Sequence, residues 1–254
     1  MHQSVLVVRE PREAMISYHN LLYEIGYAKD WVTAYSHQSD VYTHRPPVYA
    51  WEAWRDKYAL VEVEWWGWFI DFWMEGGLLR DIITHQECNM THWDLCAISH
   101  EHKYPNLTNF VSPVESQYHP RCGDSSFGMA DCHPTTVVSY ERLTNLQYGP
   151  AETRKLTSTV EGKQGIEIIG EEAQPCVWRE LVVNGMGGRL NDNRNGKGPS
   201  KDQFTFTQDQ LVALQSMLEA YINKYSSGVY VGNTVAQDLV GYLQVYKDGI
   251  DNDM

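Results

Sequence analysis

Residues 59–65 have the sequence Ala-Leu-Val-Glu-Val-Glu-Trp, in which apolar and acidic side chains alternate. A β-strand sends successive side chains to opposite faces, so this alternation predicts a half-buried strand. Its apolar members would share one face: Val61, Val63 and Trp65. Its acidic members, Glu62 and Glu64, would share the other. Trp66-Gly67-Trp68 interrupts the alternation, and we expect Gly67 to mark a β-bulge.

Outward from this stretch, other short segments are also expected to be strands because they are rich in β-branched or alternating apolar residues. These segments are 135–140, 166–169, 177–183, 229–231 and 239–246. In the last of them, Leu239, Gly241, Leu243 and Val245 would face one way. The predicted fold class is therefore α+β, mainly β.

Three segments have helical spacing instead. Pro11 suits a first helical position and Gly26 a helix stop, which predicts a helix over 11–25. A short helix is expected over 48–57. Thr207, with Gln210 three residues later, forms a capping-box pattern and begins a predicted helix over 207–225. The apolar face of this last helix consists of Leu211, Leu214, Leu218, Tyr221, Ile222 and Tyr225.

Charge and composition exclude several classes of partner. The 254 residues include 20 Lys and Arg against 33 Asp and Glu, a formal net charge of −13. Such a surface repels the phosphates of nucleic acids and anionic membranes, so we expect neither as a partner. No segment approaches the ~20 apolar residues of a membrane-spanning helix. With 9 Trp and 16 Tyr but 6 Phe, the chain is rich in side chains that suit both cores and interfaces.

The cysteines are expected to be free thiols. The apolar run within residues 1–12 is too short for a signal peptide. Without a secretion signal, an odd number of cysteines, here five, is most simply explained by reduced thiols.

One histidine and cysteine series has metal-ligand character. Cys88, His92, Cys96 and His100 recur every four residues, with His85 and His102 nearby. On a helix these residues would share a face, and an adjacent pair could chelate a metal. The whole series would span about 18 Å at 1.5 Å per residue, beyond the reach of one zinc ion. We therefore interpret it as a packed or hydrogen-bonded set.

Two further patterns have some character of a site, and we interpret both as structural. Cys122, Cys132 and His133, with His119 and Asp131 nearby, could form a zinc site or a Cys/His nucleophile pair, but they contain no C-x-x-C motif. Residues 184–188, Asn-Gly-Met-Gly-Gly, weakly resemble a phosphate-binding loop. A working loop would lead directly into a helix, whereas the predicted helix begins only at Thr207, so a surface turn is the better interpretation.

The tryptophan-rich stretch offers two more alternatives. Glu62 and Glu64 could act as a paired acid and base, although solvated alternation explains them equally well. The cluster of Trp65, Trp66, Trp68 and Trp73 could stack sugars, but a core or protein interface is the commoner role. We therefore expect no catalytic, cofactor-binding or metal-binding residues.

The C-terminal third resembles the polyhedrins and granulins, the occlusion-body matrix proteins of insect viruses. The resemblance is one of element order and residue type over residues 178–248. Its parts are Trp178–Val183, Gly185–Gly188, the helix after Phe204 and Phe206, Tyr225–Gly232 and Leu239–Lys247. Baculovirus members carry a basic cluster for nuclear import, and this chain has no run of Lys or Arg. The cytoplasmic cypovirus type is therefore favoured.

The resemblance implies a compact β-sandwich and a single domain over 1–254, with helix 11–25 as an assembly arm. It implies a non-enzymatic protein that self-assembles, as trimers in a cubic lattice, into crystals that enclose virus particles. The expected location is an occlusion body in the host cytoplasm, or in the nucleus for a baculovirus-like protein. Such crystals protect virions and dissolve at alkaline pH.

The composition is compatible with alkaline dissolution. Titration of all Tyr, Lys and Cys side chains would move the charge from −13 to roughly −43. Two alternatives stay open. Residues 181–225 also resemble zinc-dependent peptidoglycan amidases of phages, although the expected zinc histidines are not evident. The tryptophan cluster would suit a carbohydrate-binding module.

Overall fold

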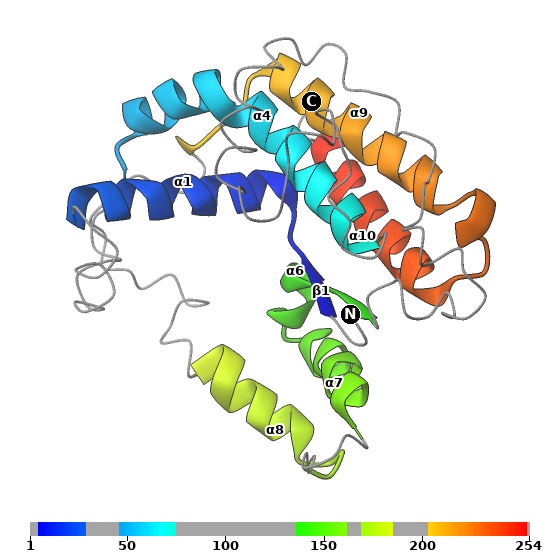
Figure 1. Ribbon diagram of the computed structural model, residues 1–254. Coiled ribbons are helices and arrows are strands. Elements are labelled where there is room, and N and C mark those ends of the chain that lie inside the picture. The colour runs from blue at the N-terminus through cyan, green and yellow to red at the C-terminus, as the bar shows by residue number, and fades with distance from the viewer. Residues whose placement is uncertain (1–4, 29–45, 75–135, 162–168, 185–202, 253–254) are drawn as a thin grey trace, which may run out of the picture. The chain divides into compact units, whose positions relative to one another are not determined.

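The computed structural model describes residues 5–28, 46–74, 136–161, 169–184 and 203–252 (Figure 1). Of these residues, 76% are helical, and the described part of the chain holds seven α-helices. Its two strands, β1 (Val5–Val8) and β2 (Thr136–Ser139), pair in parallel. The expected mainly β fold, a compact β-sandwich, is therefore wrong.

The stretch that predicted the first strand lies inside a 27-residue helix, α4 (Val48–Met74). Buried residues recur every three or four positions along α4, with Trp68 buried beside this series: Trp51, Arg55, Ala59, Val63, Gly67, Ile70 and Met74. The alternation of Val and Glu covers only residues 59–65, whereas this helical spacing covers nearly the whole element. The longer pattern prevails because each further turn buries another side chain.

Three other predicted strands are also helical. Residues 177–183 lie in α8 (Gln174–Trp178) and the following π-helical turn η5 (Arg179–Asn184), and residues 229–231 overlap the 3₁₀ turn η7 (Gly228–Tyr230). Residues 239–246 lie in α10 (Thr234–Asp251). There Leu239 and Leu243 are buried while Val245 is 65% exposed, so the period is helical and not two. Most of the expected strand at 166–169 falls outside the described residues.

Other predictions are confirmed. The helix expected over 11–25 is α1 (Pro11–Ala28), and the helix expected over 207–225 is α9 (Gln208–Tyr225). The helix expected over 48–57 is the first part of α4. The strand expected over 135–140 is β2. The prediction of one domain over 1–254 stays a prediction.

The chain divides into two compact units. Unit 1 comprises residues 1–6, 60–137 and 208–254, and unit 2 comprises residues 7–59 and 138–207. Along the sequence, α4 passes from unit 2 to unit 1 between Ala59 and Leu60.

Within unit 1, α9 and α10 pack side by side (Figure 1, orange and red). Their facing apolar side chains are fully or almost fully buried: Leu211, Leu214, Met217 and Leu218 on α9, and Leu239, Leu243 and Ile250 on α10. Gly228 and Gly232 in the connection have φ angles of 58° and 82°, which an L side chain rarely adopts. Asn233 then caps α10 by accepting a hydrogen bond from the Ala236 N–H at 3.0 Å.

Within unit 2, α6 (Tyr140–Leu143), α7 (Gly149–Val160) and α8 pack in sequence. Two buried tryptophans anchor this unit because each indole N–H reaches a backbone carbonyl. Trp51 donates to the Thr205 carbonyl at 3.0 Å, and Trp178 donates to the Leu143 carbonyl at 2.8 Å.

Gly67 is not at a bulge but makes room for a tyrosine. A Cβ atom there would lie 2.7 Å from a ring carbon of Tyr221, which is buried and hydrogen-bonded to Asp71. We predict that Gly67→Ala lowers the free energy of unfolding by about 1–3 kcal/mol through overpacking.

The matched control is Gly241→Ala in α10, where nothing lies within 4 Å of the added Cβ. It should raise the free energy of unfolding by about 1 kcal/mol because Ala favours helix. Denaturant unfolding of both variants measures the change in the free energy of unfolding and its sign. Equal changes in the two variants would contradict the close approach of α4 and α9.

Candidate functional site

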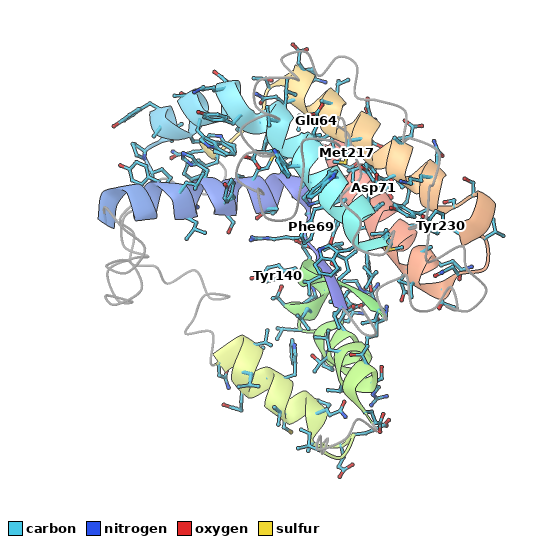
Figure 2. The ribbon with its side chains drawn as sticks, in the orientation of Figure 1. Glu64, Phe69, Asp71, Tyr140, Met217 and Tyr230 are labelled. Atoms are coloured by element: carbon cyan, nitrogen blue, oxygen red, sulfur yellow. The ribbon has the colours of Figure 1, made fainter. Side chains whose placement is uncertain are left out.

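A polar cluster in unit 1 joins the second part of α4 to α9. Asp71 on α4 accepts hydrogen bonds from three side chains of α9 (Figure 2 shows Asp71 on its helix). Its Oδ1 atom lies 2.6 Å from Lys224 Nζ and 2.6 Å from the Tyr225 hydroxyl. Its Oδ2 atom lies 3.2 Å from the Tyr221 hydroxyl. One carboxylate thus has a charged donor and two neutral donors.

Helical spacing explains why α9 presents these donors together. Tyr221, Lys224 and Tyr225 are separated by three and four residues, and side chains at such positions lie on one face of a helix. The Lys224 side chain is only 5% exposed and that of Asp71 20%. A charge this far from water needs its partner, because an unpaired buried ammonium is costly.

Aromatic rings enclose the same cluster. The rings of Tyr221 and Tyr225 stack with centroids 6.1 Å apart, and Lys224 Nζ lies 5.3 Å from the centre of the Tyr225 ring. Tyr230, which is 1% exposed, meets Tyr225 edge to face at 4.8 Å. The rings exclude water and strengthen the ion pair by lowering the local dielectric.

Glu64 lies two turns before Asp71 on α4 (Figure 2). Desolvation by burial raises the pKa of its carboxyl to about 7. The group therefore changes charge near neutral pH, as a proton-exchanging residue would have to. The expected pairing of Glu62 with Glu64 on one strand face is wrong, since residues two apart on a helix point about 200° apart.

The four tryptophans that were alternatives for sugar stacking, and more commonly form a core or interface, do not share one face of α4. Trp65 and Trp68 are three residues apart and meet edge to face at 5.2 Å. Trp73 instead meets Phe69 at 6.1 Å. At 100° per residue, Trp66 and Trp73 lie on a different side of the helix from the first pair. Trp68 is buried and the other three are half-buried.

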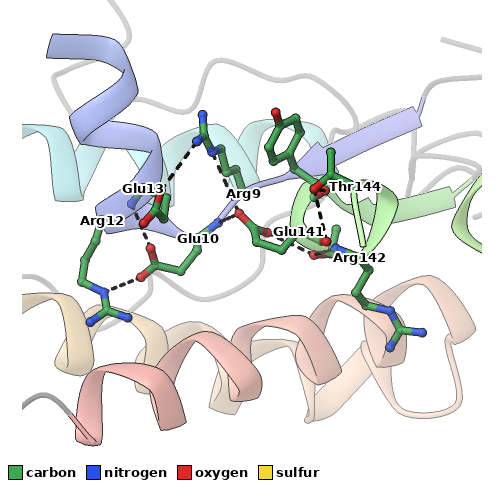
Figure 3. Close-up of polar contacts among 9 residues, drawn as sticks. Arg9, Glu10, Arg12, Glu13, Glu141, Arg142 and Thr144 are labelled. Atoms are coloured by element: carbon green, nitrogen blue, oxygen red, sulfur yellow. Dashed lines mark hydrogen bonds and ion pairs between the residues drawn. The ribbon is translucent and has the colours of Figure 1, made fainter. Parts of the chain in front are cut away.

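Unit 2 has its own charged network at the start of α1 (Figure 3). Glu10 caps the helix: its carboxylate accepts the Glu13 N–H at 2.8 Å and the Arg12 side chain at 2.6 Å. The backbone N–H of Glu10 donates to Glu141 at 3.0 Å, and Arg9 lies 4.0 Å from the same carboxylate. Burial raises the pKa of Glu10, and its bonds to Arg12 oppose that shift. These pairings tie the start of α1 and the two residues before it to α6, a structural role.

The expected cysteine and histidine sets lie outside the described residues, as do residues 185–188 of the glycine-rich loop. Asn184 itself ends η5. Within the described part of the chain, no group of three or more His, Cys, Asp or Glu side chains could hold a metal ion. Cys176 is an exposed thiol, as expected. None of the described helices is long and apolar enough to cross a membrane.

Sequence reasoning missed the Asp71 cluster. The apolar pattern assigns Tyr221 and Tyr225 to one face of the helix at 207–225, but it does not point to Lys224 or Asp71. The sequence did contain one signal for this cluster. Lys224 borders a helix face that is otherwise made of apolar and aromatic residues, so it needs a partner there. Comparison of the chain with family models, curated proteins and solved structures gives no match.

We predict that Asp71→Ala lowers the free energy of unfolding by about 3 kcal/mol because it strands the buried ammonium of Lys224. Lys224→Met should cost less, since the remaining carboxylate is partly exposed and keeps two phenol donors. The double variant should cost less than the sum of the two, as denaturant unfolding in a double-mutant cycle will measure.

Lys247→Met is the matched control, because Lys247 pairs with Asp251 one turn away at 3.1 Å on α10, where Asp251 is 36% exposed. It should leave stability nearly unchanged. Additive effects of Asp71→Ala and Lys224→Met would show that the two side chains do not interact.

Glu64 gives a pH-dependent prediction. Its folded pKa of about 7 lies above the ordinary value of 4.5, so its contribution to stability is complete below 4.5 and is lost as pH rises to about 7. Glu64→Gln should therefore match wild type near pH 4.5. At pH 8 it should be more stable by about 1–2 kcal/mol, a value discounted for partial solvation.

Denaturant unfolding at the two pH values tests this, with Glu219→Gln at an exposed position of α9 as the control. A constant difference between Glu64→Gln and wild type at both pH values would contradict the burial of Glu64.

Proposed function

We propose that the chain is a structural protein without a catalytic site that assembles with copies of itself. The observation that carries the proposal is a pair of exposed apolar stripes in unit 2. Tyr18 (43% exposed) and Leu22 (37%) lie one turn apart on α1. Val177 (41%) and Leu181 (64%) lie one turn apart on α8 and η5.

Single exposed apolar side chains are ordinary on a monomer, but two such residues on consecutive turns of one helix form a seam. A second copy of the chain presents the same stripes, so a symmetric contact between two copies would bury the seam of both. The excess of Asp and Glu argues against nucleic acid as the alternative occupant.

The form of assembly that we propose is the viral occlusion body, in which a polyhedrin-like or granulin-like matrix protein crystallises around virus particles in an insect cell. Trimers and a cytoplasmic location belong to this proposal. Its support is the composition, with 16 Tyr and a charge of −13, together with the stripes. The element order that first suggested the family no longer supports it, because residues 177–183, 229–231 and 239–246 are helical.

We predict that purified protein forms assemblies at neutral pH and that these come apart near pH 11. Titration of Tyr, Lys and Cys adds negative charge to every copy, and like charges in contact repel. Light scattering and electron microscopy across a pH series measure the result. Protein that stays monomeric at neutral pH would overturn the proposal.

A paired substitution tests the stripes themselves. Tyr18→Ser combined with Leu22→Ser should weaken assembly, so that the critical concentration for assembly rises at least tenfold. Leu146→Ser, which changes a 72% exposed residue in a turn, should not. Equal losses in both variants would mean that the α1 stripe is not an interface.

A further inference from the structure

His19 on α1 is buried among aromatic rings of unit 2. The residue is only 4% exposed. The ring centre lies 5.4 Å from that of Trp51 and 5.2 Å from that of Trp54, both in the first part of α4. Tyr23, one turn further along α1, lies 6.5 Å away. The imidazole therefore fills the contact between α1 and α4 within this unit.

The ring is hydrogen-bonded on one side only. It bonds to the backbone of Ala50. Its Nδ1 atom is buried and has no hydrogen-bond partner among the residues that the structure describes. In the neutral imidazole this atom is an acceptor without a donor, which costs about 1–3 kcal/mol. Protonation would instead put a charged N–H donor where no acceptor lies, which is far more costly.

Among the residues that the structure describes, none forms an ion pair with His19. From α4 come two indole rings. Arg55, one turn after Trp51 on the same helix, donates to the Thr205 carbonyl and to Asp56. From residues 203–207 come Phe204 and Phe206, which meet Trp51 edge to face. The remaining rings of the aromatic cluster are the phenols of Tyr18, Tyr23 and Tyr58.

The physical causes of the shift in the pKa of His19 agree with this geometry. Desolvation lowers the pKa below 6.5, and the hydrogen bond to Ala50 opposes it. A lowered folded pKa means that the unfolded chain binds the proton more readily. The contribution of His19 to stability is therefore complete above about pH 6.5 and is lost as pH falls toward the folded value.

We propose that His19 is an acid-sensitive latch, which holds α1 on the first part of α4 while neutral and releases it when protonated. Release lets the imidazolium reach water and separates α1 from Trp51 and Trp54. Because the exposed stripe of Tyr18 and Leu22 lies on the same helix, acid also changes that surface. The latch itself depends only on contacts inside unit 2 and stands whether or not the chain assembles.

Hydrogen exchange of the peptide that covers α1 tests the latch in the full-length protein. After correction for the intrinsic exchange rates, protection in wild type should fall at least tenfold between pH 7.5 and pH 5. In His19→Phe, which keeps an aromatic ring and loses the titrating group, it should change less than twofold. Tyr23→Phe is the matched control and should keep the wild-type response.

An unchanged wild type, or an equal fall in wild type and His19→Phe, would overturn the proposal. Should His19→Phe fail to fold, NMR titration of the imidazole in wild type decides the question. A midpoint clearly below 6.5 together with loss of α1 protection at the same pH supports the latch. A midpoint at or above 6.5 overturns it.

Discussion

The carboxylate of Asp71 holds α4 against α9 in unit 1, and the rest of that unit is arranged around it. Lys224 and two tyrosines converge on one side chain from consecutive turns of α9. Their approach requires Gly67, one turn earlier on α4, because any Cβ there would meet the Tyr221 ring. The pairing of α9 with α10 then buries the leucines that lie along α9 before these three residues. A polar bond fixes the register of the helices, and apolar burial supplies most of the stability.

Burial acts on the ionisable groups of the two units in the same physical sense. It raises the pKa of Glu64 in unit 1 and of Glu10 in unit 2, and it lowers the pKa of His19. In each case the low dielectric disfavours the charged form. Glu64 therefore destabilises the fold at high pH and His19 does so at low pH. Together the two groups narrow the pH range in which the protein is stable. Lys224 differs from both in having a carboxylate at 2.6 Å.

The helices at 11–25 and 207–225 could be predicted because each has an uninterrupted apolar period of three to four residues, although α1 continues past the expected stop at Gly26 to Ala28. The predictions of strands at 59–65 and 239–246 were wrong because a short alternation of apolar and polar residues is compatible with a strand or a helix. In α10, Tyr242 and Tyr246 are buried together with Leu239 and Leu243, a set that only the helical period explains. Counting tyrosine as apolar in this segment would have shifted the balance toward helix.

The sequence by itself determined the acid excess, the abundance of Tyr and Trp, and the amphipathic helices whose pattern is complete within one segment. Those properties are sums over residues or periods along the chain, so no distant partner is needed to state them. Only the tertiary structure decided that Gly67 faces a tyrosine, that Lys224 is paired, and that His19 is enclosed. Each depends on a residue far away in sequence: Asp71 and Lys224, for example, are 153 positions apart. A buried charge or ring acquires its energy from what surrounds it, and folding alone supplies those surroundings.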